Sequence, residues 1–353
     1  STAGGALTNC SDAPTVSITG QDGSATMQWQ YSNDNTYWYN ISGATSSSEV
    51  APYTSKATVW IRNQLTNGCV KYSDYIVHLS SAAAGCNFWE GFTSADAGVA
   101  SNWSKAAVPG SSSTNVLVLK TLSNSPSYGT ETAAMSAADL WIQDGATLNA
   151  GPVNHFVSGD ITNNGTFTAS TGKVTMKSTS AQAINGTAGT TFHNLTIDNS
   201  GSGVTLGAET TIGNEFTLAT GDVNANSFNL KLTSAATVSG GSDASHVLGN
   251  MVKTTAATSK FTFPVGDGTQ YKSIAITPSS SSSTNWTAKY FNTAYSNTTV
   301  DGNNGGDLDH VSTYEYWDLA RSGSANAIVE IAWVANNQVE TYADLRIAHC
   351  DGT

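Results

Sequence analysis

Between residues 140 and 240 the sequence returns repeatedly to a short apolar pair beside Asn, Thr or Gly. These apolar runs begin near Leu140, Phe156, Val174, Leu195, Phe216 and Leu230, at steps of 14 to 21 residues. No helical periodicity interrupts them. Repeats of this length, made of short strands and turn residues, are typical of a parallel β-helix or a related solenoid, in which each coil buries its apolar residues against the next.

Within such a solenoid, alternation along each strand decides which side chains enter the core. We expect three pairs to point inward: Val174 with Met176, Leu195 with Ile197, and Leu230 with Leu232. Asparagines are expected near the turns, because Asn tolerates left-handed conformations and forms side-chain ladders. These asparagines are Asn163, Asn164, Asn194 and Asn199.

The chain of 353 residues is longer than one hydrophobic core usually organises, so its length predicts two or three domains, and the pattern along the chain divides it into three. Residues 1–82 contain alternating stretches such as ATMQWQYS and ATVWIRNQL, which predict a small antiparallel β-sandwich. The repeats occupy residues 83–249. Longer strands from 250 to 353 predict a second β-sandwich, incomplete at its end. The fold class is therefore all-β.

Charge restricts the partners that the chain can have. Only 11% of the residues are charged, 26 acids against 14 bases, and the net charge is -12. No two Lys or Arg residues are adjacent, so the sequence does not predict a nucleic-acid interface, which needs clustered bases. No run of about eighteen apolar residues occurs, so no membrane-spanning helix is expected.

Four cysteines, at positions 10, 69, 86 and 350, lack the CxxC spacing of zinc sites and favour disulfides in an oxidising compartment. Cys10 and Cys69 fall in one predicted sandwich, so we expect a bridge between them; the alternative is two unpaired thiols. Cys86 and Cys350 then either join each other or link to another molecule. The predicted localisation is secreted, extracellular or at the cell surface. The start at Ser1 suggests a processed mature protein or a fragment.

Two segments resemble the immunoglobulin-like modules of large secreted adhesins of Bacteroidetes: WQYSNDNTYWYNISGAT (29–45) and CVKYSDYIVHL (69–79). NWS followed by VPG (102–110) resembles the entry to the strand-stack region of those surface proteins. FPVGDGTQY, EYWDLAR and ADLRIAHCDG resemble the domain that follows such regions, which usually carries an aromatic residue where Cys350 stands. The resemblance implies export by the type IX route and a structural or adhesive role.

A β-helix also raises the possibility of a pectin lyase or polygalacturonase, whose chemistry needs clustered Asp with a nearby base. The sequence contains no Asp-Asp pair, no GHG, no RIK and no GxSxG elbow, and its six histidines lie far apart. We therefore expect no enzyme. The leading interpretation is a non-catalytic extracellular structural or adhesive protein, and the alternative is a carbohydrate-binding or polysaccharide-processing module.

Two groups of residues are candidates for ligand contact. Oxygen-bearing side chains in DGNNGGDLDH are spaced as in a partial calcium loop, although no Glu closes it; the alternative is an ordinary acidic turn. These side chains are Asp301, Asn303, Asp307 and Asp309. Calcium is the one cofactor that the sequence suggests. Aromatic residues that could stack on sugar rings are Trp38, Tyr39, Trp89 and Trp103, with core packing as the alternative.

The expected partners are copies of the chain itself, other surface proteins, or polysaccharide. Because the sequence stops where the resembling domain continues into a further strand, a sheet edge is expected to stay open. An open edge is a template for a strand from a neighbour, and head-to-tail contacts of this kind build fibres. We therefore predict end-to-end assembly, with Cys86 or Cys350 as an intermolecular link; the alternative is a monomeric fragment of a longer adhesin.

Overall fold

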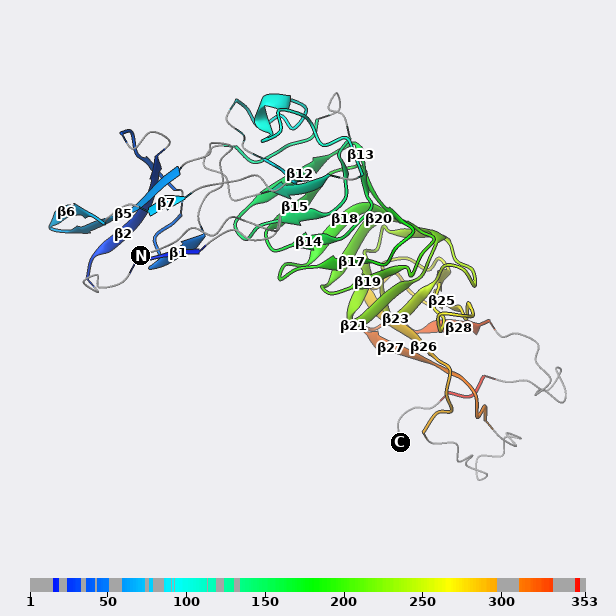
Figure 1. Ribbon diagram of the computed structural model, residues 1–353. Helices are drawn as coiled ribbons and strands as arrows, with labels where there is room; N and C mark the ends of the chain where they lie inside the picture. Colours follow the sequence, from blue (N-terminus) through cyan, green and yellow to red (C-terminus); the bar gives the residue numbers. More distant parts are fainter. Residues whose placement is uncertain are drawn as a thin grey trace.

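The computed structural model describes residues 15–18, 24–32, 36–41, 43–50, 59–73, 76–78, 86–89, 91, 93–112, 114–118, 124–129, 134–296, 311–332 and 347–349. Strands form most of this structure, and one short 3₁₀ helix, η1 (Ala100–Asn102), lies among them (Figure 1). Within these ranges, no helix has the length and apolar character needed to cross a bilayer. The all-β prediction is confirmed.

Two antiparallel sheets make up the N-terminal segment. The larger sheet has the order β3 (Tyr39–Asn40), β2 (Thr26–Ser32), β5 (Val59–Asn67) and β6 (Cys69–Tyr72), and β7 (Ile76–His78) pairs with the start of β5. The smaller sheet pairs β1 (Thr15–Ser17) with β4 (Ser48–Val50). Alternation along β2 and β5 turns one face inward, where the side chains of Trp29, Ile41, Ala44 and Ile61 form a separate core.

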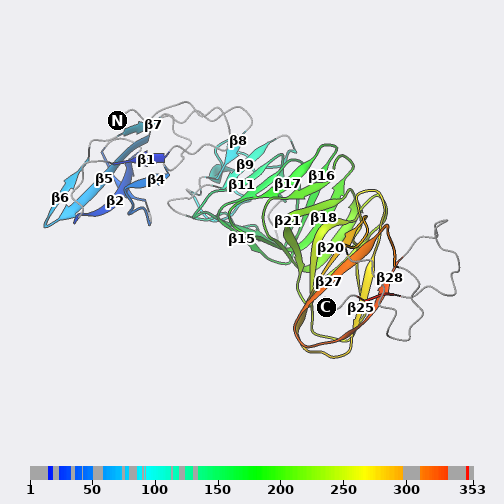
Figure 2. The same ribbon diagram turned by 90° about the horizontal axis from the view of Figure 1, so that it is seen from below.

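A parallel β-solenoid of about six turns follows, with three faces (Figures 1 and 2). The first face stacks β8 (Cys86–Phe88), β9 (Asn115–Val118), β11 (Leu140–Ile142), β14 (Ile161–Asn163), β17 (Gln182–Asn185), β19 (Val204–Leu206) and the start of β21 (Val223–Leu232). The second stacks β10 (Ser136–Ala137), β13 (Asn154–Val157), β16 (Lys173–Ser178), the second halves of β18 (Thr190–Asn199) and β20 (Thr210–Thr220), and β22 (Thr237–Gly240).

The third face begins with β12 (Thr147–Gly151) and β15 (Thr166–Ala169). It continues through the first halves of β18 and β20, the second half of β21, and β23 (Val247–Thr255). The rings of Phe167 in β15 and Phe192 in β18 are 5.3 Å apart, which continues the packing between the two pairs of strands.

Inward rows of apolar side chains run along the solenoid. On the first face, Val116, Leu140, Ile161, Ile184 and Leu206 align in register, and each is at most 1% exposed. The three predicted inward pairs, Val174–Met176, Leu195–Ile197 and Leu230–Leu232, are all buried, as predicted. From β9 onward the register gives coils of 19 to 24 residues on this face, whereas the steps read from the sequence were 14 to 21 residues. The sequence-based steps mixed strands of different faces.

Polar side chains connect each coil to the next. Asp139, Asp160 and Asp222 accept hydrogen bonds from the backbone N–H groups of Asp160, Ala183 and His246, one coil onward. Asparagines also connect coils: Asn164 accepts from Thr187, Asn194 from Asn214, and Asn199 donates to Gln182. Of these three bonds, only that between Asn194 and Asn214 joins two asparagines as in the predicted ladders. None of the four predicted asparagines has positive φ; among described non-glycine residues only Ala106 and Asn226 do.

Antiparallel strands close the C-terminal end of the solenoid. β26 (Thr284–Phe291) pairs with β23 and with β27 (Tyr316–Ser322). A second sheet joins β24 (Phe261–Phe263), β25 (Ile274–Pro278) and β28 (Ala327–Ile331). The boundary expected between residues 249 and 250 falls inside β23, and a single apolar core runs from Trp89 to Ala325. The last antiparallel sheets therefore share the solenoid's core.

Lys253 illustrates how this junction is built. Its buried ammonium donates to the carbonyl oxygens of Thr233 (2.7 Å), Ser234 (3.1 Å) and Ala236 (2.5 Å), and it lies 5.0 Å from the centre of the Phe261 ring. Burial lowers its pKa to about 8. The ammonium thus satisfies three carbonyls of the turn that ends the last full coil.

A glycine at a coil corner gives a test of the stack. Gly221 has φ +85°, and a Cβ there would lie 2.1 Å from the carbonyl oxygen of Asn199 in the preceding coil. We expect Gly221→Ala to lower the free energy of unfolding by at least about 2 kcal/mol, because the left-handed conformation and the clash both add cost. The measurement is urea unfolding followed by circular dichroism.

Gly213→Ala is the matched control, since Gly213 lies in β20 of the same coil and an added Cβ would meet no atom closer than 3.5 Å. It should change stability little. Equal stability of the two variants would contradict the close corner contact.

Candidate functional site

The four aromatic residues predicted to contact glycan occupy three different environments. Trp89 and Trp103 are 0% and 1% exposed and pack edge to face, with ring centres 5.0 Å apart. Their indole N–H groups donate to the carbonyl oxygens of Asn124 and Ala97. The prediction of glycan contact was wrong for these two, because they seal the first end of the solenoid core.

Trp38 and Tyr39 lie on opposite faces of the N-terminal sheet, because successive side chains alternate. Tyr39 is 54% exposed and pairs in register with Tyr31, and the two rings are 5.4 Å apart. Burial, followed by the charge of Tyr39, raises the pKa of Tyr31. Trp38 is partly exposed on the other side of the sheet, where its ring contacts Arg62. The two predicted residues therefore do not form one platform.

Trp38 belongs to a group of side chains on the solvent side of the larger N-terminal sheet, which we call the outer face. The register places Gln30 opposite both Asn40 and Arg62, and Gln64 opposite Tyr72. Alternation then sends these side chains away from the Trp29 core. The outer face is defined as Gln30, Trp38, Asn40, Arg62, Gln64 and Tyr72.

Arg62 is at the centre of the outer face, between two aromatic rings. Its guanidinium carbon is 4.0 Å from the centre of the Trp38 ring and 3.8 Å from the centre of the Tyr72 ring. In the sheet order, Trp38 comes from the β3 side of β5 and Tyr72 from β6 on the other side. Tyr72 is 52% exposed. Such cation–π contacts hold the planar cation in a fixed orientation.

Amide side chains fix the same guanidinium from one edge. Arg62 Nε donates to Gln30 Oε1 at 2.9 Å, while Gln30 Nε2 donates to Asn40 Oδ1 at 2.8 Å and to Gln64 Oε1 at 2.9 Å. In the described part of the chain, no carboxylate forms an ion pair with Arg62. Desolvation lowers the pKa of Arg62 and the neighbouring Tyr72 opposes this, but a guanidinium stays charged.

Alternation could have pointed to Arg62 and Tyr72 from the sequence. Arg62 lies in VWIRNQL, which was predicted as a strand, and Tyr72 lies in CVKY, part of the segment that carries the family resemblance. What a single sequence lacks is the cross-strand register, which alone shows that Trp38, Arg62 and Tyr72 meet.

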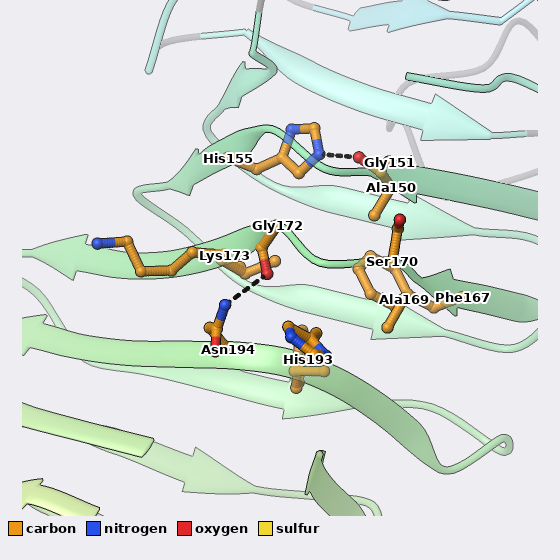
Figure 3. Close-up of a pocket in the computed structure, with 12 residues that line it drawn as sticks. Ala150, Gly151, His155, Phe167, Ala169, Ser170, Gly172, Lys173, His193 and Asn194 are labelled. Carbon is orange, nitrogen blue, oxygen red and sulfur yellow. Dashed lines mark hydrogen bonds between the residues drawn. The ribbon is translucent and has the colours of Figure 1, made fainter. Parts of the chain in front are cut away.

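A small cavity on the solenoid is lined by β12, β13, β15, β16 and β18 (Figure 3). His155 in its wall is 1% exposed, although Phe156, near which an apolar run was expected to begin, is 46% exposed. The register explains the difference, because His155 and not Phe156 aligns with the inward Val174. His155 Nδ1 accepts from the N–H of Met135 (3.1 Å), so Nε2–H donates to the carbonyl of Ala150 (2.7 Å). Both nitrogens of this neutral imidazole are therefore hydrogen-bonded to the backbone of the solenoid.

The buried imidazole predicts a pH dependence of stability. Burial lowers the pKa of His155, and the hydrogen bond to Ala150 partly opposes this. As pH falls below about 6.5, the His155 imidazole binds a proton in the unfolded chain but not in the folded chain. The free energy of unfolding therefore falls by up to about 1.4 kcal/mol per pH unit. Urea unfolding at pH 7.5, 6.0 and 5.0 measures this.

His155→Gln removes the titrating group and leaves all other histidines in place. The stability advantage of the native chain over this variant should shrink between pH 7.5 and 5.0. An advantage that is constant with pH would contradict the assignment of a neutral, buried His155.

The described cysteines differ from the predicted pairing. Cys69 opens β6 directly after the Gly68 turn and is an exposed free thiol, which contradicts the expected bridge to Cys10. The reason is position: Cys69 lies at a hairpin tip and not between the two sheets. Cys86 is buried in β8. Cys10 and Cys350 lie outside the described residues, so the pairing of Cys86 and Cys350 and the end-to-end assembly remain predictions.

The exposed thiol can be checked directly. Native protein should react at Cys69 with one maleimide reagent without denaturant, and peptide mass mapping should locate the label there. Recovery of an intact Cys10–Cys69 disulfide peptide from unreduced native protein would contradict the structure.

The predicted calcium ligands Asp301, Asn303, Asp307 and Asp309 also fall outside the described residues. Elsewhere in the described chain, no cluster of three His, Cys, Asp or Glu side chains is suited to hold a metal ion.

The C-terminal motifs serve the fold. In FPVGDGTQY, Asp267 accepts from the backbone N–H groups of Thr269 and Gln270 (both 2.8 Å), and Gly268 N–H donates to His246 Nε2 (2.9 Å). In EYWDLAR, Glu315 accepts from Lys272 Nζ and from the hydroxyl of Tyr290, both at 2.7 Å. Burial, with this hydrogen bond, raises the pKa of Tyr290.

Comparison with known proteins addresses only the segment that carries the outer face. A family described as "Domain of unknown function (DUF8696)" matches residues 1–80. No curated protein and no solved structure matches the chain.

Proposed function

We propose that the chain is a non-catalytic extracellular protein of structural and adhesive function, whose N-terminal sheet provides the binding surface. The observation that carries the proposal is the outer face, where Arg62 is held between the rings of Trp38 and Tyr72. Ordered aromatic rings beside amide donors and acceptors are suited to bind a sugar, because the rings supply apolar area and the amides bind hydroxyl groups. The resemblance to secreted surface adhesins supports the same role.

The solenoid supports the structural part of the proposal. Its side chains are used within the stack: Lys177 pairs with Asp198 (2.7 Å) and Lys231 with Glu209 (2.5 Å), each across neighbouring coils. Each coil buries its apolar row against the next, so the repeats extend one core. This arrangement suits a scaffold that carries a binding module.

Carbohydrate binding is the specific form of adhesion that the outer face favours. The processing alternative would need a carboxylate free to act as acid or base. In the described solenoid, the Asp160 carboxylate accepts from Ala183 N–H and that of Asp222 from His246 N–H, which favours a scaffolding use of these acids.

The test uses the full chain on a panel of immobilised polysaccharides, measured by surface plasmon resonance, with a reducing-end assay run in parallel. We expect binding to at least one polysaccharide and no released product. The double variant Trp38→Ala, Tyr72→Ala should bind about tenfold or more weakly, since each tenfold corresponds to about 1.4 kcal/mol.

Tyr314→Ala is the matched control, because Tyr314 is 53% exposed, close to the 52% of Tyr72, but lies outside the N-terminal sheet. It should bind as the native chain does. Absence of binding to every polysaccharide, or release of reducing ends, would contradict the proposed function.

A further inference from the structure

We propose that the outer face recognises an acidic polysaccharide, with Arg62 binding a sugar carboxylate and with Trp38 and Tyr72 packing against the sugar rings beside it. This inference rests on the proposed function and adds the chemical class of its ligand. It is based on the Nη donors of the Arg62 guanidinium, which the surrounding side chains do not bind.

A guanidinium has two flat faces and an edge of N–H donors. The centres of the Trp38 and Tyr72 rings lie 4.0 and 3.8 Å from its central carbon, on the β3 side and the β6 side of β5, so we infer that the two rings cover the flat faces. Gln30 Oε1 occupies the Nε donor. The Nη donors at the far end of the edge remain for a ligand.

Paired Nη donors match the geometry of a carboxylate, which accepts two parallel hydrogen bonds from arginine. The fork is already oriented by the rings and by Gln30, so binding would cost little side-chain entropy. A neutral sugar would leave this cation without its matching charge.

Charge supports an anionic ligand at this position. The whole chain has a net charge of -12, yet the other five members of the outer face are neutral amides and aromatic residues. The described structure shows no internal carboxylate on Arg62, unlike Lys177, Lys231, Lys260 and Lys272, which all have one. The centre of the outer face is therefore a local cation in an acidic protein.

The neighbours of Arg62 favour a polysaccharide over an acidic peptide. Aromatic rings on both sides extend the surface along a row that crosses β3, β2, β5 and β6, and the Asn40 and Gln64 amides line the same row. A chain of sugar rings offers C–H faces for the aromatic residues and hydroxyl groups for the amides. The sugar carboxylate would then bind the Arg62 guanidinium.

The experiment is isothermal titration calorimetry of the full chain with two forms of one polymer, polygalacturonate and its fully methyl-esterified form. Esterification keeps the backbone and removes the negative charge. We expect esterification to weaken binding at least about tenfold, and salt between 50 and 300 mM to weaken only the binding of the charged form.

Two substitutions of Arg62 separate the contribution of its paired hydrogen bonds from that of its positive charge. Arg62→Lys keeps the positive charge and the aliphatic stem but cannot form two parallel hydrogen bonds, so affinity for polygalacturonate should fall about tenfold. Arg62→Gln should lower the affinity for polygalacturonate further, because it also removes the positive charge. Lys71→Gln is the control, because Lys71 is an exposed base of the same strand as Tyr72 that points to the other side of the sheet. It should have little effect.

The outcomes distinguish this inference from the proposed function. Equal binding of both polymers would overturn the acidic ligand while leaving adhesion intact. An Arg62→Lys variant that binds as the native chain does would overturn the paired hydrogen bonds assigned to the Arg62 fork. Poly-glutamate that binds as tightly as polygalacturonate, with the same dependence on Arg62, would overturn the polysaccharide. No binding to any polysaccharide would remove the proposed function itself.

Discussion

Backbone hydrogen bonding between successive coils is the interaction on which the rest of the structure depends. A strand in the interior of a parallel stack has to share its N–H and C=O groups with the coil before and the coil after it. The first face continues this pairing from β8 to β23. Every other feature of the solenoid, including its apolar rows and its glycine corners, is constrained to repeat in step with this ladder.

The same constraint determines how polar side chains are used. At coil corners the carboxylates and amides accept N–H groups from the next coil, as Asp160 does for Ala183 and Asn164 for Thr187. Lys253 satisfies three carbonyls where the last turn meets the antiparallel strands. Arg62 differs from these groups, because its neighbours orient it without neutralising it. This contrast separates the scaffold from the surface that we assign to binding.

The sequence predicted what depends on local pattern. The inward orientation of Leu195 and Ile197 follows from alternation along one strand, and the asparagine bridges follow from the repeat. Cross-strand register is not local, so the sequence could not show that His155, and not the neighbouring Phe156, points inward, or that Trp38 meets Arg62 and Tyr72. Burial is equally non-local: Trp89 and Trp103 are aromatic residues like Trp38, yet they close the end of a core. Cys69 was mispaired because a hairpin tip cannot be distinguished from an inter-sheet position by spacing alone.

Side-chain NMR shows whether the Arg62 guanidinium, held between Trp38 and Tyr72, binds a carboxylate through its Nη donors. The chain has three arginines, Arg62, Arg321 and Arg346, so their Nε–Hε and Nη signals can be assigned by substitution. On titration with a galacturonate oligosaccharide, we expect large shifts and slowed exchange for the Arg62 Nη protons, with Arg321 unchanged as the internal reference. Shifts at the Trp38 indole with no change at Arg62 Nη would show that the fork does not bind the sugar carboxylate.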